Sequence, residues 1–245
     1  HVDAYTPFKN KLTSIQSDLQ HIQQAVQTST VTPGCTDVFQ ADARNTHGAL
    51  TGSSRVLTDH GTVDYIMTSP PYPAEHDYTR NQRLELLSLD HCLTTEQLQT
   101  LKKQNIRSHT KNIYTDDTHG ETVAVHENNT IHRITSEMRD IIKEENITHG
   151  FGQAYPRVVE EYFGDMVLHL HSAASLLSDT GTAAYIVADS GSYWQVEIPT
   201  SDILQELALN KTSFSTAETT HWRDITATTA DYSHVNENIL LLSKH

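Results

Sequence analysis

The amino-acid sequence predicts an α/β fold whose sheet is mainly parallel and doubly wound and closes in an antiparallel C-terminal hairpin. Short apolar runs typical of strands alternate with longer segments in which apolar residues recur every three or four positions. The last two apolar runs follow one another without a helical segment between them. A chain of 245 residues, 36% of them hydrophobic, is long enough for one substantial domain with an insertion.

Five segments are predicted as strands. Residues 63–67 form an apolar run that indicates a buried strand, and residues 183–188 form a nearly continuous apolar run of the kind found in buried parallel sheets. Weaker patterns predict strands over 36–41, 212–220 and 238–242. The first four of these segments are separated by stretches long enough to hold helices, which is why we expect a mainly parallel sheet.

Three helices are predicted in the core. The segment that opens at Tyr5 carries apolar residues at helical spacing, namely Leu12, Ile15, Leu19, Ile22 and Val26. Residues 155–177 form a long amphipathic pattern that should cover the sheet, and residues 200–209 form a shorter one. A turn over 179–182, which includes Gly181, should connect the long helix to the strand at 183–188.

The segment 73–150 is predicted as a helical insertion into a core made of residues 1–72 and 151–245. It holds predicted helices over 80–89, 94–105 and 130–145, and a polar stretch over 108–129. Because the insertion begins directly after the strand at 63–67, we expect it to act as a lid or a substrate-recognition segment at the end of that strand.

The charge of the chain bears on its partners. The formal net charge of −14 argues against a nucleic-acid partner, because such binding usually needs a basic surface. Six basic and three acidic residues lie between Arg80 and Lys111, so this segment carries +3 and the rest of the chain −17. The basic segment is either a track for phosphates or a solvated helical face.

The composition also excludes several classes of protein. The two cysteines, Cys35 and Cys92, lie far apart, so neither a disulfide framework nor a zinc site is expected. Sixteen histidines occur without a His-Glu-x-x-His pattern, so we predict no metal site. The apolar runs are short and no leader pattern opens the chain, which predicts a soluble cytoplasmic protein without a membrane span.

The motif with the clearest chemical meaning is Thr68-Ser69-Pro70-Pro71-Tyr72, which directly follows the predicted strand at 63–67. Two consecutive prolines fix two φ angles and remove two backbone donors, so the neighbouring carbonyl groups are held in one direction as acceptors. Ser69 adds a hydroxyl group and Tyr72 adds an aromatic face. This set suits a flat ring with an exocyclic amino group, such as a nucleobase, although an ordinary Pro-Pro turn has the same sequence.

This motif resembles the (Asp/Asn/Ser)-Pro-Pro-(Tyr/Phe) motif of methyltransferases that use S-adenosylmethionine to methylate amino groups, with their Rossmann-like fold. The Ser form is most similar to DNA enzymes that make N4-methylcytosine. The resemblance continues through Pro73, through residues 76–86 and to residues 237–244. It implies that Ser69, Pro70, Pro71 and Tyr72 are catalytic. Cytosine N4 is the first expected target and adenine N6 the second, while related motifs act on RNA guanine or protein glutamine.

The same resemblance implies further site residues. Asp3 matches the acidic residue that binds the cofactor ribose, and Asp42 with the backbone of Ala43 matches the step that contacts adenine. Thr68 would border the cofactor. For Asp3 the alternative is a helix cap, and for Asp42 a turn residue. Tyr78, Arg80 and Arg83 would bind the substrate DNA.

One expected part of the family pattern is missing. The Phe-x-Gly-x-Gly loop that binds methionine should precede Asp3 or follow the last strand, and the only G-x-G here, Gly150-Phe151-Gly152, does not follow a strand. Three interpretations remain: an incompletely represented enzyme, one half of a split enzyme, or a non-catalytic relative that binds DNA or protein. We expect residues preceding His1, or a second polypeptide, to supply a first strand and the Gly-rich loop.

Overall fold

The computed structural model describes residues 3–29, 34, 38–51, 63–73, 76–113, 125–191, 193–225 and 235–244. The chain divides into two units, residues 1–39 and residues 40–245, and each is described by itself. The first unit contains helix α1 (Tyr5–Thr28), which confirms the helix expected after Tyr5. Asp3 precedes it and accepts hydrogen bonds from the backbone N–H groups of Tyr5 (3.0 Å) and Thr6 (3.2 Å).

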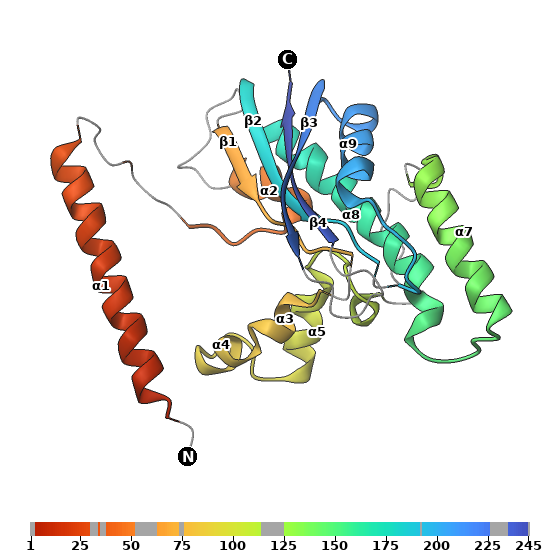
Figure 1. Cartoon of the computed structure of the whole chain (residues 1–245), viewed down its shortest axis with the longest axis horizontal. Coiled ribbons are helices and arrows are strands. Elements are labelled where there is room, and N and C mark those ends of the chain that lie inside the picture. The colour runs from red at the N-terminus through yellow and green to blue at the C-terminus, as the bar shows by residue number, and fades with distance from the viewer. Residues whose placement is uncertain are drawn as a thin grey trace. The chain divides into compact units, whose positions relative to one another are not determined.

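The second unit is built on a mixed sheet of four described strands: β1 (Val63–Thr68), β2 (Leu177–Ala188), β3 (Thr216–Ile225) and β4 (Val235–Ser243). The strand order is β1-β2-β4-β3, and β1 runs parallel to β2 (Figure 1). β4 is antiparallel to both β2 and β3. The expected α/β class and the antiparallel C-terminal hairpin are therefore present. The expectation of a mainly parallel sheet is wrong for the described strands, because one of their three pairings is parallel and two are antiparallel.

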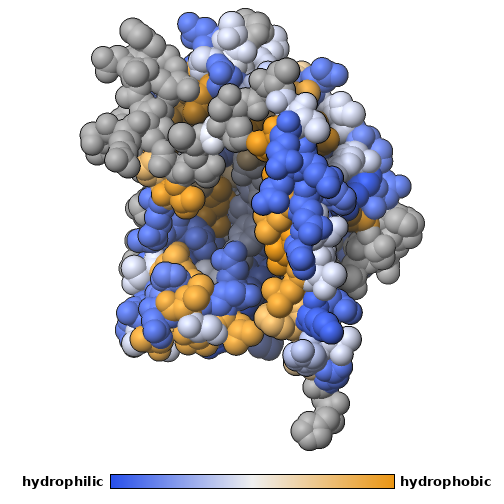
Figure 2. Space-filling model, turned by 90° about the vertical axis from the view of Figure 1, so that its left-hand side faces the viewer, coloured by the Kyte–Doolittle hydropathy of each residue, from blue (hydrophilic) through white to orange (hydrophobic). Residues whose placement is uncertain are grey.

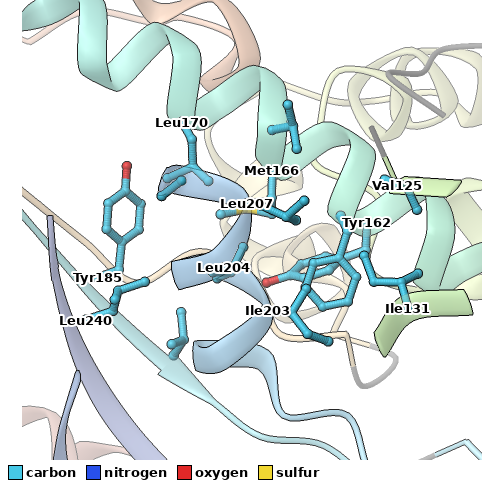
Figure 3. Packing of buried hydrophobic residues seen from close by; sticks show 14 of the residues in the cluster. Val125, Ile131, Tyr162, Met166, Leu170, Tyr185, Ile203, Leu204, Leu207 and Leu240 are labelled. Carbon is cyan, nitrogen blue, oxygen red and sulfur yellow. The ribbon is translucent and has the colours of Figure 1, made fainter. Parts of the chain in front are cut away.

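Helices α8 (Tyr155–Leu176) and α9 (Thr200–Lys211) pack on one face of this sheet (Figure 1). Figure 3 shows side chains of α8 pointing toward those of α9 and toward β2 and β4. Helix α7 (Asn129–Glu144) packs against α8 and adds Ile131, Ile134 and Met138 to the same core. The last helix of the predicted insertion is thus part of the packing of the second unit, and the lid assignment stays a prediction.

The shorter elements complete the second unit. They are η1 (Ala43–Asn45), α2 (Thr46–Thr51), α3 (Tyr78–Asn81), α4 (Arg83–Ser88), α5 (Thr95–Lys103), η2 (Thr110–Asn112) and η3 (Phe151–Ala154). The helix predicted over 80–89 is interrupted, because Gln82 leaves the helical conformation between α3 and α4. The helix predicted over 94–105 is confirmed as α5, where Thr94 and Gln97 form a capping box.

Two sequence predictions are wrong in their local structure. Residues 38–41, the described part of the strand predicted over 36–41, form no strand, and the side chain of Val38 is 93% exposed. The turn predicted over 179–182 lies inside β2. There the pairing with β1 shifts between Val63 and Tyr65, so the polar residues are accommodated as a bulge rather than as a turn.

Strand β1 is less buried than its sequence predicts. It is the outermost strand of the described sheet, and alternate side chains of a strand point to opposite faces. Tyr65 and Met67 are 82% and 78% exposed, while Ile66 is half-buried on the side of the core. The expectation of a buried strand is therefore wrong for β1, in which Val63, Ile66 and Thr68 are half-buried and no residue is fully buried.

Other expectations from composition can be compared with the described residues only. None of the described helices is long and apolar enough to cross a membrane. The described part of the chain contains no group of three or more His, Cys, Asp or Glu side chains that could hold a metal ion. Cys92 is a buried free thiol, and Cys35 lies outside the described residues.

A buried network of charges fixes α8 to the segment after α5. The side chain of Arg107, 2% exposed, pairs with Asp165 of α8 at 2.8 Å, and the Arg107 backbone N–H donates to the other Asp165 oxygen at 2.9 Å. Arg44 approaches the same carboxylate at 3.4 Å, and Glu161 lies 3.7 Å from Arg107. Asp165 thus contacts two guanidinium groups, while Asp42 beside Arg44 (2.7 Å) and Glu161 beside Arg107 supply the second negative charge.

We expect Asp165→Ala to lower the free energy of unfolding by roughly 3–5 kcal/mol, because it leaves Arg107 buried without its main counter-charge. The matched control is Glu137→Ala on α7, where the partner Arg133 is exposed and the loss should stay below about 1 kcal/mol. Urea denaturation of the three proteins measures both values. Equal, small losses in the two variants would contradict a structural role for the buried network.

Candidate functional site

Four segments of the second unit meet at the end of the sheet where β1 and β2 have their carboxyl ends, which we call the carboxyl edge. Residues 69–72 follow β1, and Asp189 follows β2, so both lie at the carboxyl ends of parallel strands. Because β4 is antiparallel to β2, its early residue Glu237 pairs with Ala188 at the same edge, and Glu237 pairs in turn with Arg223 of β3. This edge is where open α/β sheets bind their ligands.

The Pro-Pro motif is held at this edge in a defined orientation. Pro70 and Pro71 are buried, Ser69 is exposed and Tyr72 is half-buried. The Tyr72 hydroxyl donates a hydrogen bond to Glu237 Oε1 at 2.7 Å, and Arg223 Nε donates to Glu237 Oε2. The hydroxyl end of the Tyr72 ring is therefore anchored to the antiparallel hairpin.

The electrostatics of this anchor keep Tyr72 a hydrogen-bond donor. Burial, together with the hydrogen bond to Glu237, raises the pKa of Tyr72 to about 12, while a hydrogen bond from the Ser69 side chain acts in the opposite direction. Burial acts to raise the pKa of Glu237, but the hydrogen bonds from Tyr72 and Arg223 outweigh it and lower that pKa. At neutral pH the phenol is thus protonated and the carboxylate charged, so Tyr72 is unsuited to act as a base.

Two further rings lie beside the motif. The His76 ring centroid is 6.0 Å from that of Tyr72 and 4.7 Å from that of Tyr78, which it meets edge to face. The Tyr78 hydroxyl donates to the Ser69 carbonyl at 3.2 Å. Burial lowers the pKa of His76, so its ring is neutral at pH 7. The three rings give this edge a partly exposed aromatic surface next to the Ser69 hydroxyl.

Asp77 ties the start of the predicted insertion to α5. It caps α3 and accepts hydrogen bonds from the Thr79 hydroxyl (2.5 Å) and Lys102 Nζ (3.0 Å). Burial opposes ionisation, but these two hydrogen bonds lower the pKa of Asp77 to about 2. His109 lies 3.6 Å from Asp77, and burial lowers the pKa of His109 to about 4. Lys102 and Arg107, two of the six basic residues between Arg80 and Lys111, therefore pair with carboxylates of the protein itself.

The predicted substrate residues have different surroundings. Tyr78 contacts the motif through its hydrogen bond to Ser69. Arg80 and Arg83 are exposed on α3 and α4, the short helices that lie with α5 beyond the edge of the sheet (Figure 1). Their position on the surface allows contact with a large substrate, and their assignment to DNA binding stays a prediction.

Of the predicted cofactor residues in the second unit, Thr68 adjoins the motif, whereas Asp42 and Ala43 have other partners. Asp42 caps η1 and accepts three hydrogen bonds from Arg44, one from its backbone (2.9 Å) and two from its guanidinium (3.0 and 2.7 Å). His169 of α8 bonds the Ala43 carbonyl at 2.7 Å. Thr68 is the last residue of β1 and directly precedes the motif. Asp3 belongs to the first unit, where it caps α1.

Sequence reasoning missed Glu237, Arg223 and Asp189 as parts of this edge. Glu237 directly precedes the strand predicted over 238–242, and its partner Arg223 lies beyond the strand predicted over 212–220. The signal that finds both is the antiparallel register, which brings the start of β4 and the end of β3 to the carboxyl end of β1. Asp189 has a buried Oδ1 without a hydrogen-bond partner in the described chain.

The pH dependence of the free energy of unfolding tests the buried position of Asp189. Burial raises its pKa to about 6, although the backbone N–H groups of Ser201 and Thr200 at the start of α9 act to lower it. Between about pH 4 and this value the folded protein holds a proton that the unfolded chain releases. The free energy of unfolding should therefore fall as the pH rises through that window.

In Asp189→Asn the fall should be absent, so the variant gains stability relative to the wild type as the pH rises toward 6 and keeps the gain at pH 7. Urea denaturation at several pH values between 4 and 8 measures the difference. Parallel pH profiles of the two proteins would show that Asp189 ionises as it does in the unfolded chain.

The geometry of this edge stands without support from known proteins. Comparisons of the chain with family models, with curated proteins and with solved structures found no match.

Proposed function

We propose that this chain is a methyltransferase subunit or domain that directs a methyl group from S-adenosylmethionine to an exocyclic amino group of a DNA base. Cytosine N4 is the first expected target and adenine N6 the second. The observation that carries the proposal is the position of Ser69-Pro70-Pro71-Tyr72 at the carboxyl end of β1, in a mixed sheet with an antiparallel C-terminal hairpin. The Rossmann-like methyltransferase fold named by the resemblance has such a hairpin.

The motif can hold an amino group in the required geometry. The lone pair of an exocyclic amine is delocalised into the base, and acceptors that bond its N–H groups favour a tetrahedral nitrogen. The exposed Ser69 hydroxyl and the Pro70 carbonyl are the acceptors in this proposal. The Tyr72 ring, anchored through Glu237, would stack on a base that has left the helix.

S-adenosylmethionine would supply the methyl group, but the described residues do not fit a complete site for it. The Asp42 carboxylate is occupied by Arg44, and Asp3 caps α1. Gly150 adopts a positive φ of 89° just before η3, and a side chain at Gly152 would collide with the Trp194 ring, so both glycines have local structural roles. We therefore propose that a second polypeptide, or residues preceding His1, completes the donor site.

A second candidate function follows from the same observation. A chain whose Asp42 is engaged by Arg44, and in which Gly150 and Gly152 have local structural roles, could be a non-catalytic subunit that binds DNA or protein. This alternative keeps the substrate edge and has no donor site. It predicts binding of the polymer without transfer of a methyl group.

We expect Ser69→Ala to lower turnover roughly 100-fold, the scale of losing one well-placed hydrogen bond to the reacting group. Tyr72→Ala should mainly raise the KM for the base, while Tyr72→Phe keeps the ring and loses only the anchor to Glu237. Transfer of labelled methyl groups to DNA, RNA and protein in parallel, with the segment or subunit that completes the donor site present, measures these effects. Arg133→Ala on exposed α7 serves as the control.

Wild-type turnover in both Ser69→Ala and Tyr72→Ala would contradict the catalytic role of the motif. Label in protein or RNA with unlabelled DNA would overturn the choice of polymer and leave the reaction type intact. Mass spectrometry of nucleosides from the methylated DNA distinguishes cytosine N4 from adenine N6.

Calorimetric titration of S-adenosylmethionine tests the donor site. We expect no binding to the chain alone and micromolar binding once the completing segment or subunit is added. Tight binding by the chain alone would contradict our interpretation of Asp42 and of the Gly150 region. Absence of binding in both samples would favour the non-catalytic alternative.

A further inference from the structure

A chain of hydrogen bonds with a single direction leads from the antiparallel hairpin to the Ser69 hydroxyl. Arg223 Nε donates to Glu237 Oε2, and the Tyr72 hydroxyl donates to Glu237 Oε1 at 2.7 Å. A hydrogen bond from the Ser69 side chain reaches the Tyr72 oxygen. All four residues belong to the second unit, so the chain of bonds does not involve residues 1–39.

The charge of Glu237 fixes the direction of every proton in this chain of bonds. Hydrogen bonds from Tyr72 and Arg223 lower the pKa of Glu237, so it is a carboxylate at neutral pH and has no proton to donate. The Tyr72 proton therefore points toward Glu237, and the Tyr72 oxygen accepts the Ser69 proton. Because the single hydroxyl proton of Ser69 is engaged in this way, its oxygen has only lone pairs left for a further partner.

We propose that Glu237, acting through Tyr72, makes Ser69 a hydrogen-bond acceptor and thereby selects an amino group over a carbonyl group in the base at the carboxyl edge. This inference rests on the proposed function, because it concerns the base that the motif would hold. Cytosine and adenine have an exocyclic amino group, whereas thymine and uracil have the O4 carbonyl oxygen in that place. Glu237 and Arg223 are positioning residues in this proposal, since they act on the base through Tyr72 and Ser69.

An acceptor at Ser69 treats the two groups unequally. An amino N–H donates to the Ser69 oxygen, while a carbonyl oxygen would set lone pairs against lone pairs and lose its hydrogen bond to water. One missed hydrogen bond between neutral groups corresponds to roughly a tenfold difference in affinity. Hydrogen bonds in series polarise one another, and this series ends on the charge of Glu237. The Ser69 oxygen should therefore be a stronger acceptor than that of an isolated serine.

The helices beyond the carboxyl edge do not provide this selection. They expose both hydrophobic and charged side chains, namely Leu84, Leu87, Arg80 and Arg83. Figure 2 shows hydrophobic and hydrophilic residues intermixed on the side of the second unit that carries α4. Contacts with phosphates carry no information about the base, and stacking tolerates every base. The choice between an amino and a carbonyl group therefore depends on the hydrogen bonds of the motif.

Arg223 determines what happens when the charge of Glu237 is removed. The side chain in Glu237→Gln has one oxygen and one NH2 group, and the oxygen must face Arg223, which can only donate. The NH2 group then donates to the Tyr72 oxygen, so the Tyr72 proton turns toward Ser69. The Ser69 proton is released toward the base. The substitution thus reverses the whole chain of bonds with little change in shape.

Binding of 2′-deoxycytidine and 2′-deoxyuridine to the full chain, measured by saturation-transfer NMR without a methyl donor, tests the proposal. We expect the wild type to prefer deoxycytidine by about tenfold and Glu237→Gln to prefer deoxyuridine. Tyr72→Phe should prefer neither, because it leaves the Ser69 hydroxyl free to donate or accept. The matched control Glu218→Gln removes the same charge from β3 and should keep the wild-type preference.

The ratio of the two affinities separates selection from a structural role. The nucleosides also differ by the proton on N3, but this difference is the same for every variant, so a change in the ratio reports the group at position 4. If Glu237 only supports the fold, Glu237→Gln weakens both nucleosides equally, and an unchanged ratio would overturn the proposal. A wild type that binds neither nucleoside or prefers deoxyuridine would overturn it as well.

Tyr72→Phe gives the same test without altering the charge at 237, so the proposal can be refuted even if Glu237→Gln does not fold. A Tyr72→Phe variant that keeps the wild-type ratio would contradict the role of the hydroxyl. Failure of the proposed reaction has a different result. A chain that shows the reversal in Glu237→Gln but transfers no methyl group when the donor site is completed would be the non-catalytic alternative, with the base selection intact.

Discussion

The hydrogen bond from Tyr72 to Glu237 is the interaction on which the candidate site depends. It joins the rigid Pro-Pro corner after β1 to Glu237, which pairs with Ala188 of β2 near the start of β4. Two distant parts of the chain therefore form one surface. Arg223 keeps Glu237 charged and correctly placed. The site is therefore a property of the sheet topology, because a parallel β4 would place Glu237 at the opposite edge.

Much of this architecture could be predicted from local patterns, and the exceptions have physical reasons. Helices were predicted from sequence patterns where α1, α5, α7, α8 and α9 lie, and the capping box at Thr94 is a further local signal for α5. The segment at 38–41 failed because its apolar residues find no neighbouring strand and remain exposed. The segment at 179–182 failed because a glycine-containing polar stretch can be absorbed as a bulge as well as a turn. Pattern alone does not distinguish these outcomes.

For the site, sequence patterns identified the motif but not the residues that hold it in place. The Ser69–Tyr72 corner and Tyr78 are adjacent in the chain, so their proximity was predictable, whereas the contact of Tyr72 with Glu237 spans 165 residues and follows only from strand register. Asp42 shows the reverse problem. Its position matched an expected role, but its neighbour Arg44 satisfies its carboxylate, and a nearby arginine is no signal that two residues will pair.

The outer position of β1 has a consequence for the rate at which its backbone exchanges hydrogen with solvent. Only one side of β1 pairs with another described strand, β2, and successive N–H groups of a strand point in opposite directions. Amides that face β2 should exchange slowly and those on the other side quickly, which gives an alternating pattern along six residues. A further strand paired with the open side of β1 would slow exchange at every amide and remove the alternation. Deuterium uptake along β1 therefore reports whether the sheet continues beyond β1.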